Sequence, residues 1–165
     1  MQIAAFIIPR NPFPYALLLY TGQRVGDVAK MVRRDISADG LHVIQDKTGA
    51  ELYLEVLPEL DVAMRAYPAN GFALIGRPDG KPMTDKGLSH LIRDVVKQAG
   101  LPAKCVAHGL RKAMMRRLAE AGATEKQIAA WSGHKTLREI ERYTKAADQK
   151  RLAKAGADKM RTRSA

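Results

Sequence analysis

Apolar residues follow a helical spacing through most of the chain and a strand spacing in one short part of it. The first helical stretch is a nearly continuous apolar run, YALLLY over residues 15–20, which stops at Thr21 and Gly22. A second short helix is expected directly after this glycine, because apolar residues then recur at helical intervals. Its core-facing positions are Val25, Val28, Ala29 and Val32.

The strand spacing occupies residues 41–57. The segments LHVIQ and ELYLEV are rich in β-forming residues and partly alternate, and the intervening DKTGA supplies the glycine that a short turn requires. This pattern predicts a β-hairpin with Lys47 at its tip. A lysine in a turn commonly serves solubility, but a hairpin tip can also hold an ammonium group over a ligand bound elsewhere.

Helical spacing returns after the hairpin. The expected helices run from Pro58 to about Ala66, from Thr84 or Asp85 to Gly100, from His108 to Gly122, from Thr124 to the glycine before His134, and from Thr136 through Tyr143. Thr124 with Gln127, and Thr136 with Glu139, read as capping boxes. Residues 147–160 have helical propensity but little apolar face, and the RTRSA end is expected to fray. This order of elements predicts a mostly helical α+β domain.

Length and charge limit the class of partner that this chain is expected to bind. The chain has 165 residues, which suits one ordinary domain, and its 28 Lys and Arg against 17 Asp and Glu give a formal net charge of +11. This balance favours a polyanion, with nucleic acid as the leading candidate, although a basic, solvated surface would have the same composition. The sequence has no apolar run of about 20 residues, so a membrane partner is not expected. Cys105 is the single cysteine, which fits a reducing, intracellular setting.

The candidate chemistry gathers in residues 107–143. His108 and Arg111 are three residues apart, so they share a face of the helix expected there. His134 follows a glycine at a helix end, and Tyr143 lies one short helix further on. Histidines, an arginine and a tyrosine near helix ends, surrounded by positive charge, suit a phosphate ligand.

Three common kinds of catalytic site lack their sequence pattern. The four histidines include no H-x-x-x-H pair and the cysteine stands alone, so a zinc site is not expected. The sequence also has no G-x-S-x-G elbow and no G-x-x-x-x-G-K-[ST] phosphate loop. Phosphoryl transfer remains, with arginines gripping the non-bridging oxygens and a tyrosine hydroxyl, of free pKa about 10, as nucleophile.

Five motifs resemble those of the tyrosine recombinases, and more narrowly of phage-type and genomic-island integrases. They are TGQRVGDV around Arg24, DKTG around Lys47, HGLR at His108 to Arg111, SGH at His134 and ERYT at Tyr143. They follow the order of the family with similar gaps, from about Tyr15 to Met160. The resemblance implies a catalytic domain in which a small antiparallel sheet lies on a helical bundle, with no cofactor and no metal.

By this resemblance, Tyr143 attacks the scissile phosphate of double-stranded DNA and forms a 3′-phosphotyrosyl link, which frees a 5′-hydroxyl. Arg24 and Arg111 hold the non-bridging oxygens. Lys47 protonates the leaving 5′ oxygen from its place on the hairpin. The link conserves energy, so the implied reaction of strand cleavage and rejoining needs no ATP.

The resemblance assigns three further residues. His108 accepts or relays a proton, His134 hydrogen-bonds the phosphate, and Asp27 braces the pocket and orients Arg24. The implied assembly is a tetramer on DNA in the bacterial cytoplasm, with no membrane and no small-molecule substrate. The family's C-terminal helix often docks onto a neighbouring protomer, which would explain the weakly amphipathic tail.

The sequence departs from the family at its start. Family members carry an N-terminal core-binding domain that clamps the other face of the duplex, and by the resemblance we expect this sequence to lack it. Residues 1–14 are therefore expected to be a linker or the truncated end of that domain. Residues 15–165 are expected to be the catalytic domain, with a tail helix from about residue 147.

Two alternatives stay open. The first is a non-catalytic, basic helical DNA-binding module, because residues 124–140 superficially resemble a helix-turn-helix. It predicts DNA binding that survives loss of Tyr143, with no covalent product. The second is a type IB topoisomerase, which shares the pocket, but the short length and the integrase-like C-terminal sequence argue against it.

Overall fold

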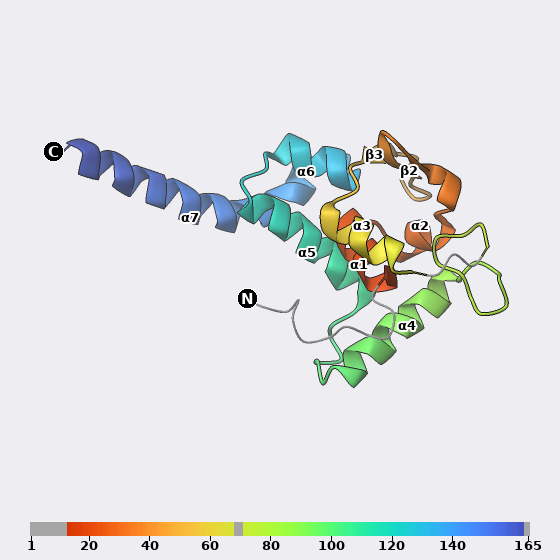
Figure 1. Cartoon of the computed structure of the whole chain (residues 1–165). Coiled ribbons are helices and arrows are strands. Elements are labelled where there is room, and N and C mark those ends of the chain that lie inside the picture. The colour runs from red at the N-terminus through yellow and green to blue at the C-terminus, as the bar shows by residue number, and fades with distance from the viewer. Residues whose placement is uncertain (1–12, 68–70, 164–165) are drawn as a thin grey trace.

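The computed structural model describes residues 13–67 and 71–163, which form a helical domain with one small sheet (Figure 1). The elements are α1 (Phe13–Thr21), α2 (Val25–Lys30), the 3-10 turn η1 (Arg33–Asp35), β1 (Ile36–Ser37), β2 (Gly40–Ile44), β3 (Glu51–Leu54), α3 (Pro58–Arg65), α4 (Asp85–Gln98), α5 (Ala107–Glu120), α6 (Glu125–Ser132) and α7 (Arg138–Arg163). The fold is therefore the mostly helical α+β class that the sequence predicts.

The predicted hairpin is confirmed, and a third short strand extends it. β2 pairs with β3 in antiparallel register, with His42 opposite Tyr53, and β1 pairs with the other edge of β2. The inward face of β2 carries Leu41 and Val43, both buried. Because alternate residues of a strand share a face, the side chain two positions beyond Val43 also points inward, and that residue is Gln45.

Helix α1 is the centre of the main core. It is buried on nearly every side, as its apolar run predicts, and it packs against α3 and α5. Leu17 and Leu18 are almost completely buried within it. Complete burial of such side chains stabilises a fold by roughly 1.5–3 kcal/mol each, so α1 is a firm base for the loop that follows it.

A second core joins α5, α6 and α7. Met115, Ile128 and Ile140 are fully buried in it, and Trp131 packs against both cores. The first half of α7 belongs to this core, whereas its second half extends away from the rest of the described chain (Figure 1). No helix in the described ranges combines the length and apolar character needed to cross a membrane.

Several local predictions are refined. Val32 follows α2 instead of facing the core from within it, and forms an isolated bridge with Ala73. The capping box of Thr124 and Gln127 is present. The capping box predicted for Thr136 and Glu139 was wrong. Helix α7 begins only at Arg138, and the Thr136 hydroxyl donates to the Glu139 carboxylate instead.

The two ends of the chain also differ from expectation. The expected linker over residues 1–14 falls mainly outside the described residues, although α1 already begins at Phe13. The tail does not form a separate helix from residue 147, because one continuous helix runs from Arg138 to Arg163 and carries Tyr143 near its start. Most of the RTRSA end, which was expected to fray, is still helical.

Candidate active site

Arg111 on α5 is a buried arginine whose guanidinium faces two backbone carbonyls. It is only 3% exposed, and it donates from Nη1 to the Gly22 carbonyl at 2.7 Å and from Nη2 to the Ser132 carbonyl at 2.8 Å. Burial, and next the charge of Arg24, lowers the pKa of Arg111 from 12.5 to about 10. No carboxylate of the described residues pairs with this guanidinium. Its positive charge is therefore largely uncompensated.

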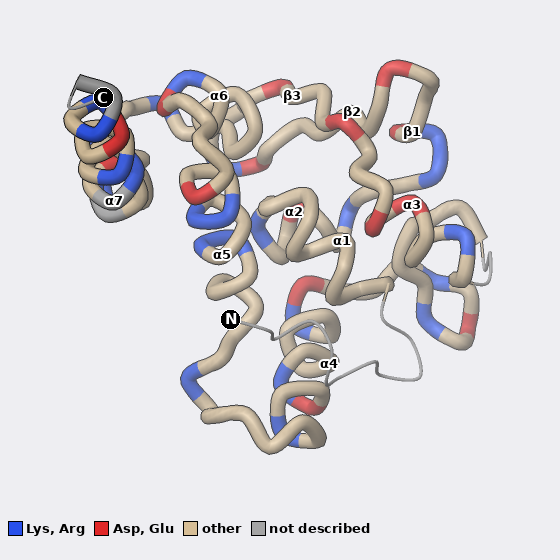
Figure 2. The backbone as a smooth tube through the Cα atoms, turned by 60° about the vertical axis from the view of Figure 1, so that its left-hand side comes forward, with Lys and Arg blue, Asp and Glu red and all other residues tan. Residues whose placement is uncertain are grey.

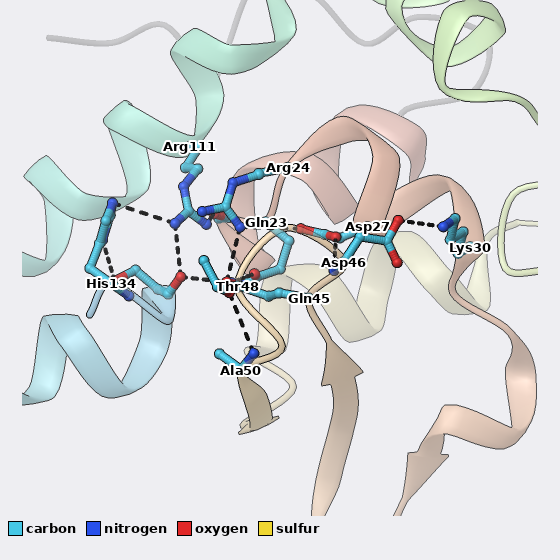
Figure 3. Close-up of polar contacts among 12 residues, drawn as sticks. Gln23, Arg24, Asp27, Lys30, Gln45, Asp46, Thr48, Ala50, Arg111 and His134 are labelled. Carbon is cyan, nitrogen blue, oxygen red and sulfur yellow. Dashed lines mark hydrogen bonds and ion pairs between the residues drawn. The ribbon is translucent and has the colours of Figure 1, made fainter.

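Arg24 directly precedes α2 and lies beside Arg111 (Figure 3). Its Nη1 donates to Oε1 of Gln45 at 2.9 Å and lies 3.6 Å from Oδ2 of the buried Asp27. The other oxygen of Asp27 accepts a hydrogen bond from the backbone amide of Asp46. Asp27 thus links Arg24 to the hairpin turn, an arrangement that supports its expected bracing role.

Two buried glutamines connect the hairpin to the helical part of the site. The Gln45 side chain is fully buried, and its Nε2 donates to Oε1 of Gln23 at 2.6 Å and to the Ser132 carbonyl at 2.8 Å. Its Oε1 also accepts from the Thr48 hydroxyl at 2.6 Å. Gln23 donates to the carbonyls of Thr21 and Trp131, which fixes its own orientation.

His134 follows the left-handed turn at Gly133 and faces Arg111. Its Nε2 lies 3.5 Å from Nη2 of Arg111, and its Nδ1 lies 2.6 Å from the hydroxyl of Ser132. That hydroxyl donates its proton to the Ile128 carbonyl, so it must accept from Nδ1–H of the imidazole. Burial, followed by the charge of Arg111, lowers the pKa of His134. In the neutral ring Nε2 therefore keeps its lone pair, which faces the Nη2 donor of Arg111.

His108 and Tyr143 lie within the electrostatic reach of the two arginines. His108 is exposed overall, but the burial of part of its side chain lowers its pKa. The charges of Lys112, Arg111 and other cations lower the pKa further. Tyr143 is half-buried, and its hydroxyl accepts a hydrogen bond from Nη2 of Arg142 at 2.9 Å. Tyr143 also raises the pKa of Arg111 through its charge, after the larger effects of burial and of Arg24.

Lys47 stands apart from this cluster. It is exposed in the turn between β2 and β3, and its ammonium has no hydrogen-bond or ion-pair partner in the described part of the chain. The backbone of Gln45 holds the turn itself, since its carbonyl accepts from the Gly49 amide and its backbone N–H donates to the Ala50 carbonyl. Of the six expected site residues, the structure joins Arg24, Arg111 and His134 most closely, with His108 and Tyr143 beside them.

Sequence reasoning missed the polar groups that hold these side chains in place. Gln23, Gln45 and Ser132 are fully or almost fully buried, yet glutamine and serine are commonly exposed. One pattern could have revealed Gln45, since it continues the inward alternation of Leu41 and Val43. The carbonyl partners of Arg111 could not have been predicted from the sequence, because every residue has a backbone carbonyl whatever its side chain.

Basic residues recur around the site and beyond it. Lys and Arg lie along α5 and along the outward half of α7 (Figure 2). The described residues include no group of three or more His, Cys, Asp or Glu placed to hold a metal ion. The cluster itself consists of cations and hydrogen-bond donors, a set of groups that suits an anion.

Comparison with known proteins agrees with this arrangement. Tyrosine recombinase XerC of Staphylococcus carnosus (strain TM300) is 24% identical over 148 residues, covering 81% of this chain and 48% of that protein. A lambda integrase tetramer bound to a Holliday junction superposes with a TM-score of 0.69 at 25% identity, covering 79% of this chain and 41% of that one. XerA recombinase gives a TM-score of 0.73 at 20% identity, covering 88% of this chain and 59% of that one, which bears on the fold alone.

The matches cover most of this chain but only part of each relative. The chain spans about half the length of the curated relatives it matches. The family model described as "Phage integrase family" matches residues 10–150, which include all six expected site residues. This range contains the whole cluster around Arg24 and Arg111, and the chain therefore belongs to the phage integrase family.

Proposed function

We propose that this chain is the catalytic domain of a site-specific DNA recombinase that cleaves and rejoins strands through a 3′-phosphotyrosyl intermediate. The observation that carries the proposal is the pair of adjacent arginines, one of them buried against carbonyls with no carboxylate partner in the described chain. Two such cations repel one another, and a phosphate anion between them would remove that repulsion. The site is therefore suited to a phosphodiester.

Each expected residue has a role in this reaction. Arg24 and Arg111 grip the non-bridging oxygens, and Tyr143 attacks the phosphorus from its place at the start of α7. His134 hydrogen-bonds the phosphate, and His108 accepts or relays the tyrosine proton; the lowered pKa of His108 keeps it neutral, as a proton acceptor must be.

Lys47 completes the proposed reaction by donating a proton to the leaving 5′ oxygen. Its exposed place on a hairpin turn leaves its ammonium accessible to DNA. It is not in contact with the rest of the cluster, so its action requires that the DNA bring the two parts together. Proton donation of this kind contributes roughly 10²–10⁴-fold to the rate of a reaction.

Double-stranded DNA is the proposed partner, and a tetramer on DNA the proposed assembly. The net charge of +11 supports a polyanionic ligand, and lambda integrase, a structural relative, is a tetramer when bound to a Holliday junction. The proposed location is the bacterial cytoplasm, where such DNA is found. The curated relatives are about twice as long as the part of them that this chain matches, so the activity of a whole recombinase is part of the proposal.

A covalent-trapping assay tests the proposal. The protein is incubated without added metal with nicked duplexes from the DNA that flanks its gene, and an SDS-resistant protein–DNA adduct is sought. Tyr143→Phe should give no adduct while DNA affinity stays within a few fold, because the lost hydroxyl is the nucleophile. Tyr53→Phe is the matched control, since Tyr53 is an exposed tyrosine on β3, outside the cluster.

The assay separates the proposal from its alternative. An adduct that persists in Tyr143→Phe would show that another residue is the nucleophile. Salt-sensitive DNA binding without any adduct, even when a core-binding domain is fused to the chain, would favour the non-catalytic DNA-binding module. That alternative has no support among the comparisons with known proteins.

A further inference from the structure

The Gln45 side chain bonds both to Arg24 and to the backbone carbonyl that holds Arg111. On one side its Oε1 accepts from Nη1 of Arg24 at 2.9 Å. On the other side its Nε2 donates to the Ser132 carbonyl at 2.8 Å, and the same carbonyl accepts from Nη2 of Arg111 at 2.8 Å. A continuous chain of hydrogen bonds thus runs from one guanidinium to the other through the amide of Gln45 (Figure 3).

The orientation of this amide is fixed by its neighbours. Gln23 donates its NH₂ group to two backbone carbonyls, so its Oε1 is the atom that faces Gln45. Nε2 of Gln45 therefore meets two acceptors, and Oε1 meets two donors, from Arg24 and Thr48. A flipped amide would set oxygen against oxygen at both acceptors. All four hydrogen-bonding positions are used in one orientation.

Close packing holds Gln45 in this place as well. The residue is fully buried, so it cannot touch DNA. Gly133 lies against its amide so closely that a Cβ atom at that position would be 2.6 Å from Nε2. The Arg24 guanidinium has a weaker second hold, since its nearest approach to Asp27 is 3.6 Å. Gln45 supplies the shorter contact.

From this geometry we propose that Gln45 is a positioning residue, which sets the Arg24 guanidinium at a fixed place relative to Arg111. It acts through Arg24 and not on the substrate. The inference rests on the proposed function, because the value of a fixed spacing lies in gripping two oxygens of one phosphate. A misplacement of about 1 Å in such a grip can reduce the rate roughly 100-fold.

The first test observes Arg24 directly and does not depend on activity. Gln45→Met keeps an unbranched side chain of similar length but has no amide. The arginine side-chain NMR signals of the full chain are compared in the two proteins. The Nε–Hε signal of Arg24 should move toward that of a freely rotating arginine, whereas Arg111 should keep its shift, because its two carbonyl partners remain. An unchanged Arg24 signal would overturn the proposal.

The second test uses the adduct assay as a double-mutant cycle. Gln45→Met should slow adduct formation by about 10–100-fold in the normal chain. It should have almost no further effect in an Arg24→Ala background, because the group that it positions is gone. A purely structural role would give the same loss in both backgrounds, and that result would also overturn the proposal.

A conservative variant and a buried control sharpen the result. Gln45→Glu keeps the acceptor for Arg24 but places an oxygen against the Ser132 carbonyl. The variant should therefore still hold Arg24 but lose the hydrogen bond to the carbonyl that Arg111 shares. Thr144→Val removes another buried polar group, whose hydroxyl bonds Glu125 and the Glu141 carbonyl, and should leave the Arg24 signal unchanged. If no adduct forms even when a core-binding domain is fused to the chain, the proposed function fails, and the NMR comparison still decides the role of Gln45.

Discussion

The turn at Gly133 permits a quantitative test of how closely the site is packed. Gly133 ends α6 in the left-handed region at φ +68°, which costs a residue with a side chain roughly 1–2 kcal/mol. In Gly133→Ala the new methyl group would also lie 2.6–2.8 Å from three atoms of the Gln45 amide. That amide must then move and give up part of its hydrogen bonding, at a cost of about 1–3 kcal/mol.

Gly100→Ala is the matched control for this change. Gly100 follows α4 in the same backbone region, at φ +64°, but has no atom within 4 Å of an added Cβ. It should therefore lose only the backbone contribution of about 1–2 kcal/mol, against about 2–5 kcal/mol for Gly133→Ala. The difference between the two variants measures the contact with Gln45.

Urea denaturation of both variants, followed by circular dichroism, gives the two free energies of unfolding. Adduct formation should fall in Gly133→Ala and remain normal in Gly100→Ala, because only the first displaces the turn that carries His134. Equal destabilisation of the two variants would refute the reasoning. It would mean that the Gln45 amide can move away from the new methyl group without a loss of folding free energy.

Three other outcomes are expected. Arg111→Ala should reduce adduct formation at least 10²–10³-fold, roughly the value of one charge-stabilising donor, and a loss below about tenfold would indicate that another cation holds the phosphate. Lys47→Ala should be rescued by DNA with sulfur at the bridging 5′ position, because a thiolate leaves without a proton; a failure of rescue would contradict its role as acid. The lowered pKa values of His108 and His134 mean that the folded chain binds fewer protons than the unfolded one as the pH falls through about 6.5. The free energy of unfolding should therefore decrease from about pH 7.5 to 5.5, and His134→Gln should flatten that dependence in urea titrations; an unchanged dependence in this variant would contradict the argument.

The sequence predicted the helices and the hairpin because their signals are local. The apolar run of α1, the capping box at Thr124 and the glycine in the hairpin turn each act within a few residues. The start of α7 was misplaced at Thr136, since a Thr and a Glu at the right spacing can also bond through their side chains alone.

The contents of the site were predictable only in part. Motif resemblance supplied the six expected site residues, and the structure places Arg24, Arg111 and His134 together. The supporting groups depend on contacts between distant segments, such as Gln45 with Ser132, 87 positions apart. Such contacts arise from tertiary packing, which residue type and spacing do not encode locally.

The hydroxyl of Ser132 has a consequence for the energetics of DNA docking. By giving its proton to the Ile128 carbonyl, it holds the neutral His134 ring in the tautomer whose Nε2 carries a lone pair. A phosphate oxygen and that lone pair would repel one another until the ring gains a proton from the solvent. Docking should therefore consume a proton, and the heat of binding measured by calorimetry should vary with the ionisation enthalpy of the buffer. In Ser132→Ala the ring can adopt the other tautomer, so that dependence on the buffer should become weaker.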